Sequence, residues 1–167
     1  MSDKRQDDSE TRETKTFLEH KRILVPVDGS VNSTRAVDTA IRLAKDYDAQ
    51  LIFLNVIPAP KLTFGAGSVL GTPTVALDKY YEYAEVQART LVDKMIKLAK
   101  DNSVSATGEI VKSSESTVQS VVDQEKDQKI DLIVIGTRGL GSFKKMIIGS
   151  VSSGVVTYSQ CPVLVVR

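Results

Sequence analysis

The chain has 167 residues, an apolar fraction of 41% and a formal net charge of +1. Its length suits one domain with a full hydrophobic core, and its composition is that of a globular protein that folds in water. The near-neutral charge argues against a dedicated nucleic-acid binder, and no apolar run approaches the roughly 20 residues that a membrane span requires. We therefore expect neither nucleic acid nor a membrane as a partner.

The first 20 residues are rich in charge and contain no apolar stretch of the kind that directs secretion. We expect residues 1–20 to form a charged flexible tail and residues 21–167 to form the single domain. Cys161 is the only cysteine, which excludes an internal disulfide and fits a reducing compartment. These features together predict a cytoplasmic protein in which Cys161 packs as a small apolar side chain.

Short apolar runs alternate with amphipathic stretches through the first part of the domain. The run RILVPVD at 22–28 predicts a buried strand that leads into a glycine and a serine. The next residues place apolar side chains from Ala36 to Tyr47 on one side of a helix, with Ser30 to Ser33 as candidate caps. The continuous apolar run QLIFLNVI at 50–57 predicts a second strand that is covered on both faces.

A long segment rich in proline and glycine separates the second strand from the next helix. We expect residues 58–76 to form an irregular loop. From Leu77 to Leu98 apolar residues recur at steps of three and four, which predicts an amphipathic helix. Its apolar stripe suits the domain's own sheet, as layered domains require, and would also suit a protein partner.

The C-terminal part of the chain repeats the alternation of strands and helices. A weakly strand-like segment at 105–112 precedes a short helix opened by Ser116. The run DLIVIG at 131–136 is the most strand-like segment of the chain and leads into a glycine-rich loop. A short helix from about Ser150 and a last strand, PVLVVR at 162–167, complete the pattern.

Strands that alternate with helices favour a parallel sheet with helices on both faces. We therefore predict one doubly wound α/β domain with a five-stranded, mainly parallel sheet in the order 3-2-1-4-5. In such sheets ligands bind beyond the carboxyl ends of the strands, where the strand order reverses, and two segments end there, at 28–30 and at 136–139. The last strand would form a sheet edge, which is covered within a monomer or paired with the same strand of a second copy.

Three glycines and a serine follow the strand at 131–136 with the spacing Gly136-x2-Gly139-x9-Gly149-Ser150. Glycines let backbone amides approach phosphate oxygens closely because no Cβ intervenes. The unpaired N–H groups and the dipole at the start of the following helix favour an anion, and the hydroxyls of Ser150 and Ser152 add donors. As a set these residues predict a phosphate site, whereas a single glycine here would indicate only a tight turn.

These residues resemble the universal stress proteins, in particular the branch that binds ATP. The glycine spacing, DLIVIG, GSVS and CPVLVV carry the resemblance in the C-terminal part, and RILVPVDGS and LIFLNVI carry it in the N-terminal part. It covers nearly all of residues 21–167. It implies a bound adenine nucleotide, ATP, with Mg²⁺ or Mn²⁺, and a homodimer formed through the C-terminal strand at 163–167. It also implies a nucleotide-dependent regulatory module in the stress response, with a protein partner that the sequence does not identify.

The resemblance also implies roles for individual residues. Asp28, after Pro26 and Val27, would lie near ribose and help to hold the divalent cation. Val56 would recognise adenine through its backbone, so we expect little effect from Asn55, which stands where many relatives carry histidine. The other residues would border the ribose and the phosphates: Ile135, Gly136, Gly139, Leu140, Gly141, Ser142, Gly149, Ser150, Val151 and Ser152.

Basic side chains near the glycine-rich loop have two interpretations. Arg138, Lys144 and Lys145 are suited to neutralising phosphate charge. Surface lysines, however, are usually only solvated. We therefore include Arg138 alone in the candidate site.

Two other functions fit the same residues. A slow ATPase or adenylyl-transfer enzyme would use Asp28 and a divalent cation to position the triphosphate. Against it, the sequence has no GxxxxGK[ST] loop, no histidine near the site and no obvious pair of carboxylates. A nucleotide-free dimeric interaction protein would lack the glycine spacing, which this chain retains. We expect a binding module with at most weak ATP hydrolysis and assign no catalytic residue.

Overall fold

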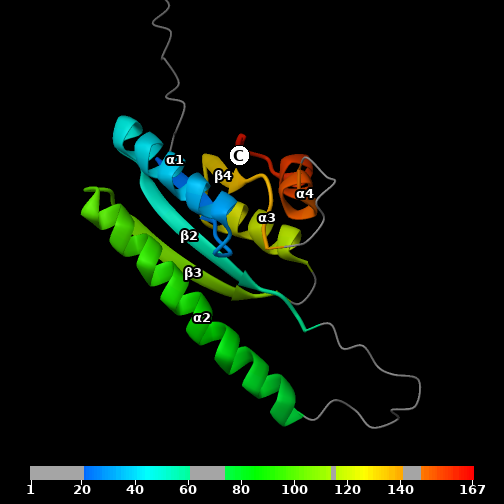
Figure 1. Ribbon diagram of the computed structural model, residues 1–167. Coiled ribbons are helices and arrows are strands. Elements are labelled where there is room, and N and C mark those ends of the chain that lie inside the picture. The colour runs from blue at the N-terminus through cyan, green and yellow to red at the C-terminus, as the bar shows by residue number, and fades with distance from the viewer. Residues whose placement is uncertain (1–20, 61–73, 114–115, 141–147) are drawn as a thin grey trace, which may run out of the picture.

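Five parallel strands form one sheet in the order β3-β2-β1-β4-β5 (Figure 1). The computed structural model describes residues 21–60, 74–113, 116–140 and 148–167. The predicted α/β class and strand order are confirmed, and the pairing between the described strands is parallel throughout. The strands are β1 (Arg22–Pro26), β2 (Gln50–Ile57), β3 (Ala106–Lys112), β4 (Leu132–Gly136) and β5 (Val163–Val166).

Helices cover both faces of the sheet (Figure 1). On one face lie α1 (Val31–Tyr47) and α2 (Thr74–Asp101). On the other lie α3 (Thr117–Asp127) and α4 (Ser150–Tyr158). The domain is therefore doubly wound, with one hydrophobic core on each side of the sheet.

Successive side chains of each strand serve the two cores in turn. In β2, Leu51 and Phe53 pack against α1 and α2, whereas Ile52 and Leu54 pack toward α3 and α4. All four side chains are at most 2% exposed. Because both faces of the sheet are covered, the strands read as continuous apolar runs in the sequence.

Serine side chains cap two helices at their N-termini, and a third helix has no such cap. Ser30 Oγ accepts a hydrogen bond of 3.1 Å from Ser33 N–H at the start of α1. Ser116 Oγ accepts one of 3.1 Å from Gln119 N–H at the start of α3. At the start of α4 the capping position holds Gly149, which makes no side-chain hydrogen bond. Among the described residues, no side chain therefore caps the first-turn amides of α4.

The start of α2 differs from the sequence-based prediction. The irregular loop was expected to reach residue 76, but α2 begins at Thr74. The last proline of this segment is residue 73, and proline is compatible with a position next to the first turn of a helix. The boundary follows this proline, whereas the apolar stripe on which the prediction rested begins later. The rest of the expected loop, residues 61–73, lies outside the described residues.

The strand β5 lies at one edge of the sheet and, within the part of the chain that the structure describes, pairs with β4 alone. The predicted edge position is confirmed. The expected tail, residues 1–20, lies outside the described residues. Among the helices of the described part, none combines the length and the apolar character that crossing a membrane requires.

Candidate functional site

A cavity of about 830 Å³ opens at the carboxyl ends of β1, β2 and β4, where the strand order reverses. Every described residue that the sequence analysis assigned to the site lines this cavity, and the role of these residues in binding stays a prediction. Two others, Gly141 and Ser142, lie outside the described residues, as do Lys144 and Lys145. The lining residues in question are Pro26, Val27, Asp28, Val56, Ile135, Gly136, Arg138, Gly139, Leu140, Gly149, Ser150, Val151 and Ser152.

The cavity exists because neighbouring strands end at different heights. Gly29 takes a φ of 82°, which glycine adopts readily, and the chain turns there from β1 into α1. The last backbone hydrogen bond between the first two strands runs from Val27 N–H to Leu54 O, at 2.8 Å. Since β2 continues to Ile57, its final residues extend beyond β1 and form part of the cavity wall.

The start of α4 forms the polar end of the cavity. Gly149 N–H donates a hydrogen bond of 2.6 Å to Thr137 O, which holds the helix start close to the end of β4. Ser150 and Val151 in the first turn line the cavity. Because Gly149 at the capping position has no side chain, the N–H groups of this turn and the positive end of the helix dipole are suited to an anion.

The two serines predicted to donate hydroxyl groups differ in their surroundings. Ser150 is exposed and lines the cavity. Ser152 is only 3% exposed, and its Oγ donates a hydrogen bond of 2.7 Å to Gly136 O. The hydroxyl hydrogen of Ser152 is thus used within the protein, where it ties α4 to the end of β4.

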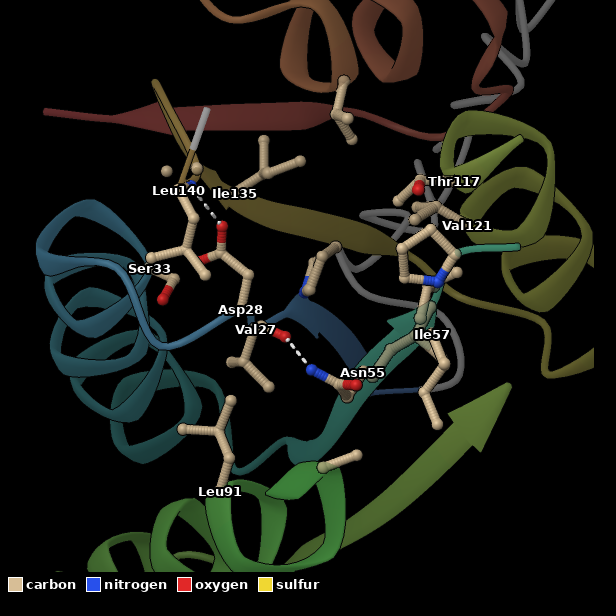
Figure 2. A pocket seen from close by; sticks show the side chains of 18 of the residues that line it. Val27, Asp28, Ser33, Asn55, Ile57, Leu91, Thr117, Val121, Ile135 and Leu140 are labelled. Atoms are coloured by element: carbon tan, nitrogen blue, oxygen red, sulfur yellow. Dashed lines mark hydrogen bonds between the residues drawn. The ribbon is translucent and has the colours of Figure 1, made fainter. Parts of the chain in front are cut away.

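One carboxylate links the two loops that border the reversal point. Asp28 Oδ1 accepts a hydrogen bond of 3.0 Å from Ser30 N–H. Asp28 Oδ2 accepts one of 2.9 Å from Leu140 N–H, drawn as a dashed line in Figure 2. A Cβ on Gly139 would collide with Asp28 Oδ2, so glycine at this position lets the carboxylate reach Leu140 N–H without moving aside. Among the described lining residues, Asp28 is the only acid and Arg138 the only base.

The rest of the wall is mostly apolar. It comes from α2, α3, further positions of β2, Pro58 and Ser33 of α1, which the sequence analysis did not assign to the site. In Figure 2, Leu91 of α2 lies below Val27, and Thr117 and Val121 of α3 lie on the far side of β2. The additional lining residues are Ser33, Leu54, Asn55, Ile57, Pro58, Tyr80, Tyr83, Ala84, Gln87, Ala88, Leu91, Thr117 and Val121.

Only a faint signal in the sequence marks the contribution of α2. The helix stripe was predicted from its period, which shows that one face is buried but not whether a sheet or a cavity lies opposite. Ala84 and Ala88 occupy successive turns of that stripe, and such small side chains leave room between helix and sheet. For Thr117 and Val121 we find no signal, because a capped short helix looks the same with or without a cavity beside it.

A divalent cation would find one protein ligand in this cavity. Among the described residues no group of three or more His, Cys, Asp and Glu side chains is placed to hold a metal ion. Each oxygen of Asp28 accepts one N–H, which leaves lone pairs for a cation. Mg²⁺ characteristically uses one or two carboxylates together with phosphate oxygens and water, so the residues present fit a cation that arrives with a triphosphate.

A family model described as the universal stress protein family matches residues 19–167. The chain belongs to the universal stress protein family. Universal stress protein YxiE of Bacillus subtilis is 31% identical over 147 residues, which cover 87% of this chain and 98% of that protein. The resemblance stated from the glycine spacing and the two strand motifs is thereby confirmed.

Solved structures of universal stress proteins share the fold. UspA from Lactobacillus plantarum is 28% identical with a TM-score of 0.67, covering 89% of this chain and 98% of that one. A universal stress protein in complex with cAMP is 23% identical with a TM-score of 0.64, over 89% and 97% of the two chains. A family member from Arabidopsis thaliana with AMP bound is 18% identical with a TM-score of 0.62, over 87% and 90%. Some members of the family therefore bind adenine nucleotides.

Proposed function

We propose that this universal stress protein binds ATP in the cavity and acts as a nucleotide-dependent regulatory module in the stress response. The observation that carries the proposal is that the uncapped start of α4 opens into a cavity of about 830 Å³ whose other walls are mostly apolar. A ligand with an anionic group at one end and a flat apolar base at the other would fit this cavity. The anionic group would lie at the start of α4, and the base would lie against the apolar walls. The adenine nucleotides bound to the two related structures support the choice of base.

The orientation of the nucleotide follows from the polarity of the walls. The triphosphate would lie against the amides of Ser150 and Val151, with Arg138 as the only described cation in reach of the cavity. The ribose would lie beside Asp28, which would also ligate Mg²⁺ or Mn²⁺ together with the phosphates. The base would lie beside Val56, beyond the end of β1.

The direct test begins with the nucleotide that the protein carries. Protein purified without added nucleotide is denatured, and the released small molecules are identified by mass. Emptied protein is then titrated with ATP and Mg²⁺ in a calorimeter. We expect saturable binding. The absence of heat from well-folded, empty protein would refute ATP binding.

A substitution at the capping position tests whether α4 holds the phosphates. The backbone of Gly149 has φ −70° and ψ 160°, the extended conformation in which aspartate caps a helix. The variant Gly149→Asp would place a carboxylate on the first-turn amides and abolish triphosphate binding. Its Cβ would lie 3.2 Å from Thr137 O, so Gly149→Ala, which has the same Cβ and no carboxylate, is the control for that contact and should still bind ATP. Ser153→Asp, which adds the same charge one turn further along α4 at an exposed position, is the matched control and should bind ATP. Equal affinity in both aspartate variants would contradict the proposed phosphate site.

A regulatory role and slow turnover predict different product yields. Both oxygens of the only described acid in the cavity already accept amide hydrogens, which disfavours that acid as a strong general base. We expect no ADP above background under conditions that saturate the site. ADP production that disappears in Asp28→Ala would instead indicate an ATPase.

A homodimer through β5 completes the proposal. The edge strand carries Leu164, which is 38% exposed, and the adjoining helix α4 exposes Val156 and Tyr158 by 50% and 67%. An unpaired edge beside such side chains favours pairing with a second copy. Light scattering should give twice the chain mass, and Leu164→Asp should give the monomer. Val86→Asp, at an equally apolar exposed position on α2, should remain dimeric.

The cytoplasmic location stays a prediction.

A further inference from the structure

The end of β2 lines the cavity with a peptide edge to which no described backbone group bonds on the β1 side. Leu51 N–H donates to Ser105 O, just before β3, and Ile57 O accepts from Ser113 N–H, just after β3. The odd-numbered residues of β2 therefore direct their backbone N–H and C=O groups toward β3. Even-numbered residues such as Leu54 direct theirs toward β1. The N–H and C=O groups of Val56 therefore face the side on which β1 has already ended.

A regular parallel ladder would use the Val56 N–H. Pro26 lies opposite Leu54, and Val27 N–H donates to Leu54 O. The next bond of the ladder would run from Val56 N–H to Val27 O. Within the described residues that backbone bond does not form.

The side chain of Asn55 takes its place. Asn55 Nδ2 donates a hydrogen bond of 2.7 Å to Val27 O, drawn as a dashed line in Figure 2. Only the amide nitrogen of an asparagine can donate to a carbonyl, so the partner fixes the orientation of this side chain. Asn55 thus provides a side-chain donor to Val27 O, directly after β1. A regular ladder would use the Val56 N–H as the donor to this carbonyl.

We propose that Asn55 is the positioning residue for base recognition: by holding Val27 O, it keeps the Val56 N–H and C=O open to the edge of a purine. The proposal rests on the proposed nucleotide site. Neighbouring donor and acceptor groups on one strand edge complement a purine that presents an acceptor next to an amino donor, as adenine does, whereas guanine presents a carbonyl in place of the amino group. The sequence alone led us to expect little effect from Asn55, and the geometry reverses that expectation.

The substitution Asn55→Leu removes the amide while keeping the branched shape and size of the side chain. In the variant, Val27 O lacks its side-chain donor and Val56 N–H is the nearest group that the ladder geometry supplies. We then expect the Val56 N–H to donate a hydrogen bond to Val27 O, so that the Val56 N–H is no longer available to a ligand. Asn102→Leu is the matched control, because Asn102 Nδ2 also donates to a backbone carbonyl, Leu98 O at 2.9 Å, at the opposite end of α2.

Amide hydrogen exchange followed by NMR tests the edge without any nucleotide. In the wild-type protein and in Asn102→Leu the Val56 N–H should exchange rapidly, and in Asn55→Leu it should become protected at least about 10-fold, as expected for a newly formed ladder hydrogen bond. Urea unfolding of all three proteins verifies that they are folded. Slow exchange of Val56 in the wild type, or unchanged exchange in Asn55→Leu, would overturn the proposal.

Binding of three probes then tests recognition of the base. Asn55→Leu should lose about 10-fold in affinity for ATP, the effect of about one hydrogen bond, and retain its affinity for inorganic tripolyphosphate and GTP. An equal loss for ATP and tripolyphosphate, or no loss for ATP, would overturn the positioning role. If the wild-type protein binds neither ATP nor tripolyphosphate, the proposed function fails, and the exchange of Val56 still decides whether Asn55 holds the edge open.

Discussion

Leu140 N–H donates a hydrogen bond of 2.9 Å to Asp28 Oδ2, across 112 residues of sequence. The other oxygen of the same carboxylate accepts from Ser30 N–H at 3.0 Å. One side chain therefore joins the loop after β1 to the loop after β4, on either side of the point where the sheet order reverses. This link fixes the spacing of the two loops before any ligand arrives, so the cavity is preorganised on this side.

Removing this carboxylate should weaken both the fold and the binding of ATP. Hydrogen bonds to a charged group contribute about 1.5 to 3 kcal/mol each when they are buried. Because Leu140 is exposed, we expect Asp28→Ala to lower the free energy of unfolding by only about 1 to 2 kcal/mol. The affinity for ATP should fall as well, since the loops lose their fixed spacing. Urea unfolding and calorimetry measure the two effects.

A second aspartate provides the control for this experiment. Asp38 lies at an exposed position on α1, where a change to alanine removes the same charge from the protein. Asp38→Ala should leave both the unfolding free energy and the ATP affinity close to those of the wild type. Equal losses in Asp28→Ala and Asp38→Ala would show that net charge matters and that the link between the loops does not.

A methyl group at Gly139 should act through the same carboxylate. The added Cβ of Gly139→Ala would collide with Asp28 Oδ2, so the hydrogen bond to Leu140 should break and the ATP affinity should fall. In an Asp28→Ala background the methyl would meet no other atom of the described residues within 4 Å, its chain neighbours aside. A double-mutant cycle should therefore show that the second substitution adds little to the first. Additive losses would mean that Gly139 serves the site by a separate route, such as direct contact with a phosphate.

The fold was predictable because parallel strands that are covered on both faces appear in the sequence as continuous apolar runs. The segment 132–136, for example, has no polar side chain at any position, as expected for a short strand that is covered on both faces. The glycine spacing likewise predicted the loop that lines the cavity. At Gly136, Gly139 and Gly149 another part of the protein lies so close that an added Cβ would contact it. At Gly136, for example, an added Cβ would lie 2.7 Å from the backbone carbon of Asn32.

The finer roles in the site were not predictable, because they depend on which group reaches a partner first. Ser152 has the same hydroxyl as Ser150, yet only the structure shows that its hydrogen goes to Gly136 O. The hydrogen bond from Asn55 Nδ2 to Val27 O likewise has no sign in the sequence, and the effect of this side chain on binding stays a prediction. Periodicity reports the buried face of a segment, whereas these hydrogen bonds depend on which groups far apart in sequence the fold brings within bonding distance.

Away from the cavity, Glu125 should be important for stability. This carboxylate is 4% exposed, and its Oε1 accepts hydrogen bonds of 2.7 Å from both Gln160 N–H and Cys161 N–H. It thereby holds the turn between α4 and β5 against α3. Glu125→Ala would leave these two part-buried amide donors without their acceptor and should cost about 2 kcal/mol. Glu125→Gln keeps an acceptor oxygen and should cost about 1 kcal/mol or less.

The midpoint of urea unfolding separates these two variants of Glu125. Asp123→Ala serves as a control on the same helix, since its exposed carboxylate accepts only from Gln119 Nε2, a surface pair whose loss costs a few tenths of a kcal/mol, roughly. If Glu125→Gln proves as unstable as Glu125→Ala, the charge of the carboxylate holds the turn, and its two accepted hydrogen bonds do not suffice.

The same carboxylate should make Cys161 an unreactive thiol. Burial, and then the neighbouring negative charge of Glu125, raise the pKa of Cys161 from 9.0 to about 12. Since the thiolate is the nucleophile, alkylation by iodoacetamide at pH 8 should be far slower for the folded protein than for the urea-unfolded chain. Glu125→Gln should speed the reaction of the folded protein by lowering that pKa. A rate in the folded wild type equal to that of the unfolded chain would contradict this assignment.

The raised pKa also predicts how stability depends on pH, with a definite sign. Below pH 9.0 the thiol is protonated in both the folded and the unfolded chain, so it adds no pH dependence. Between pH 9.0 and about 12 the unfolded chain releases a proton that the folded protein retains, so stability must fall as the pH rises. Lysines titrate in the same range, and Cys161→Ala corrects for them. The wild type should lose stability more steeply than Cys161→Ala from pH 9 upward, and parallel curves would show that the folded thiol ionises as freely as the unfolded one.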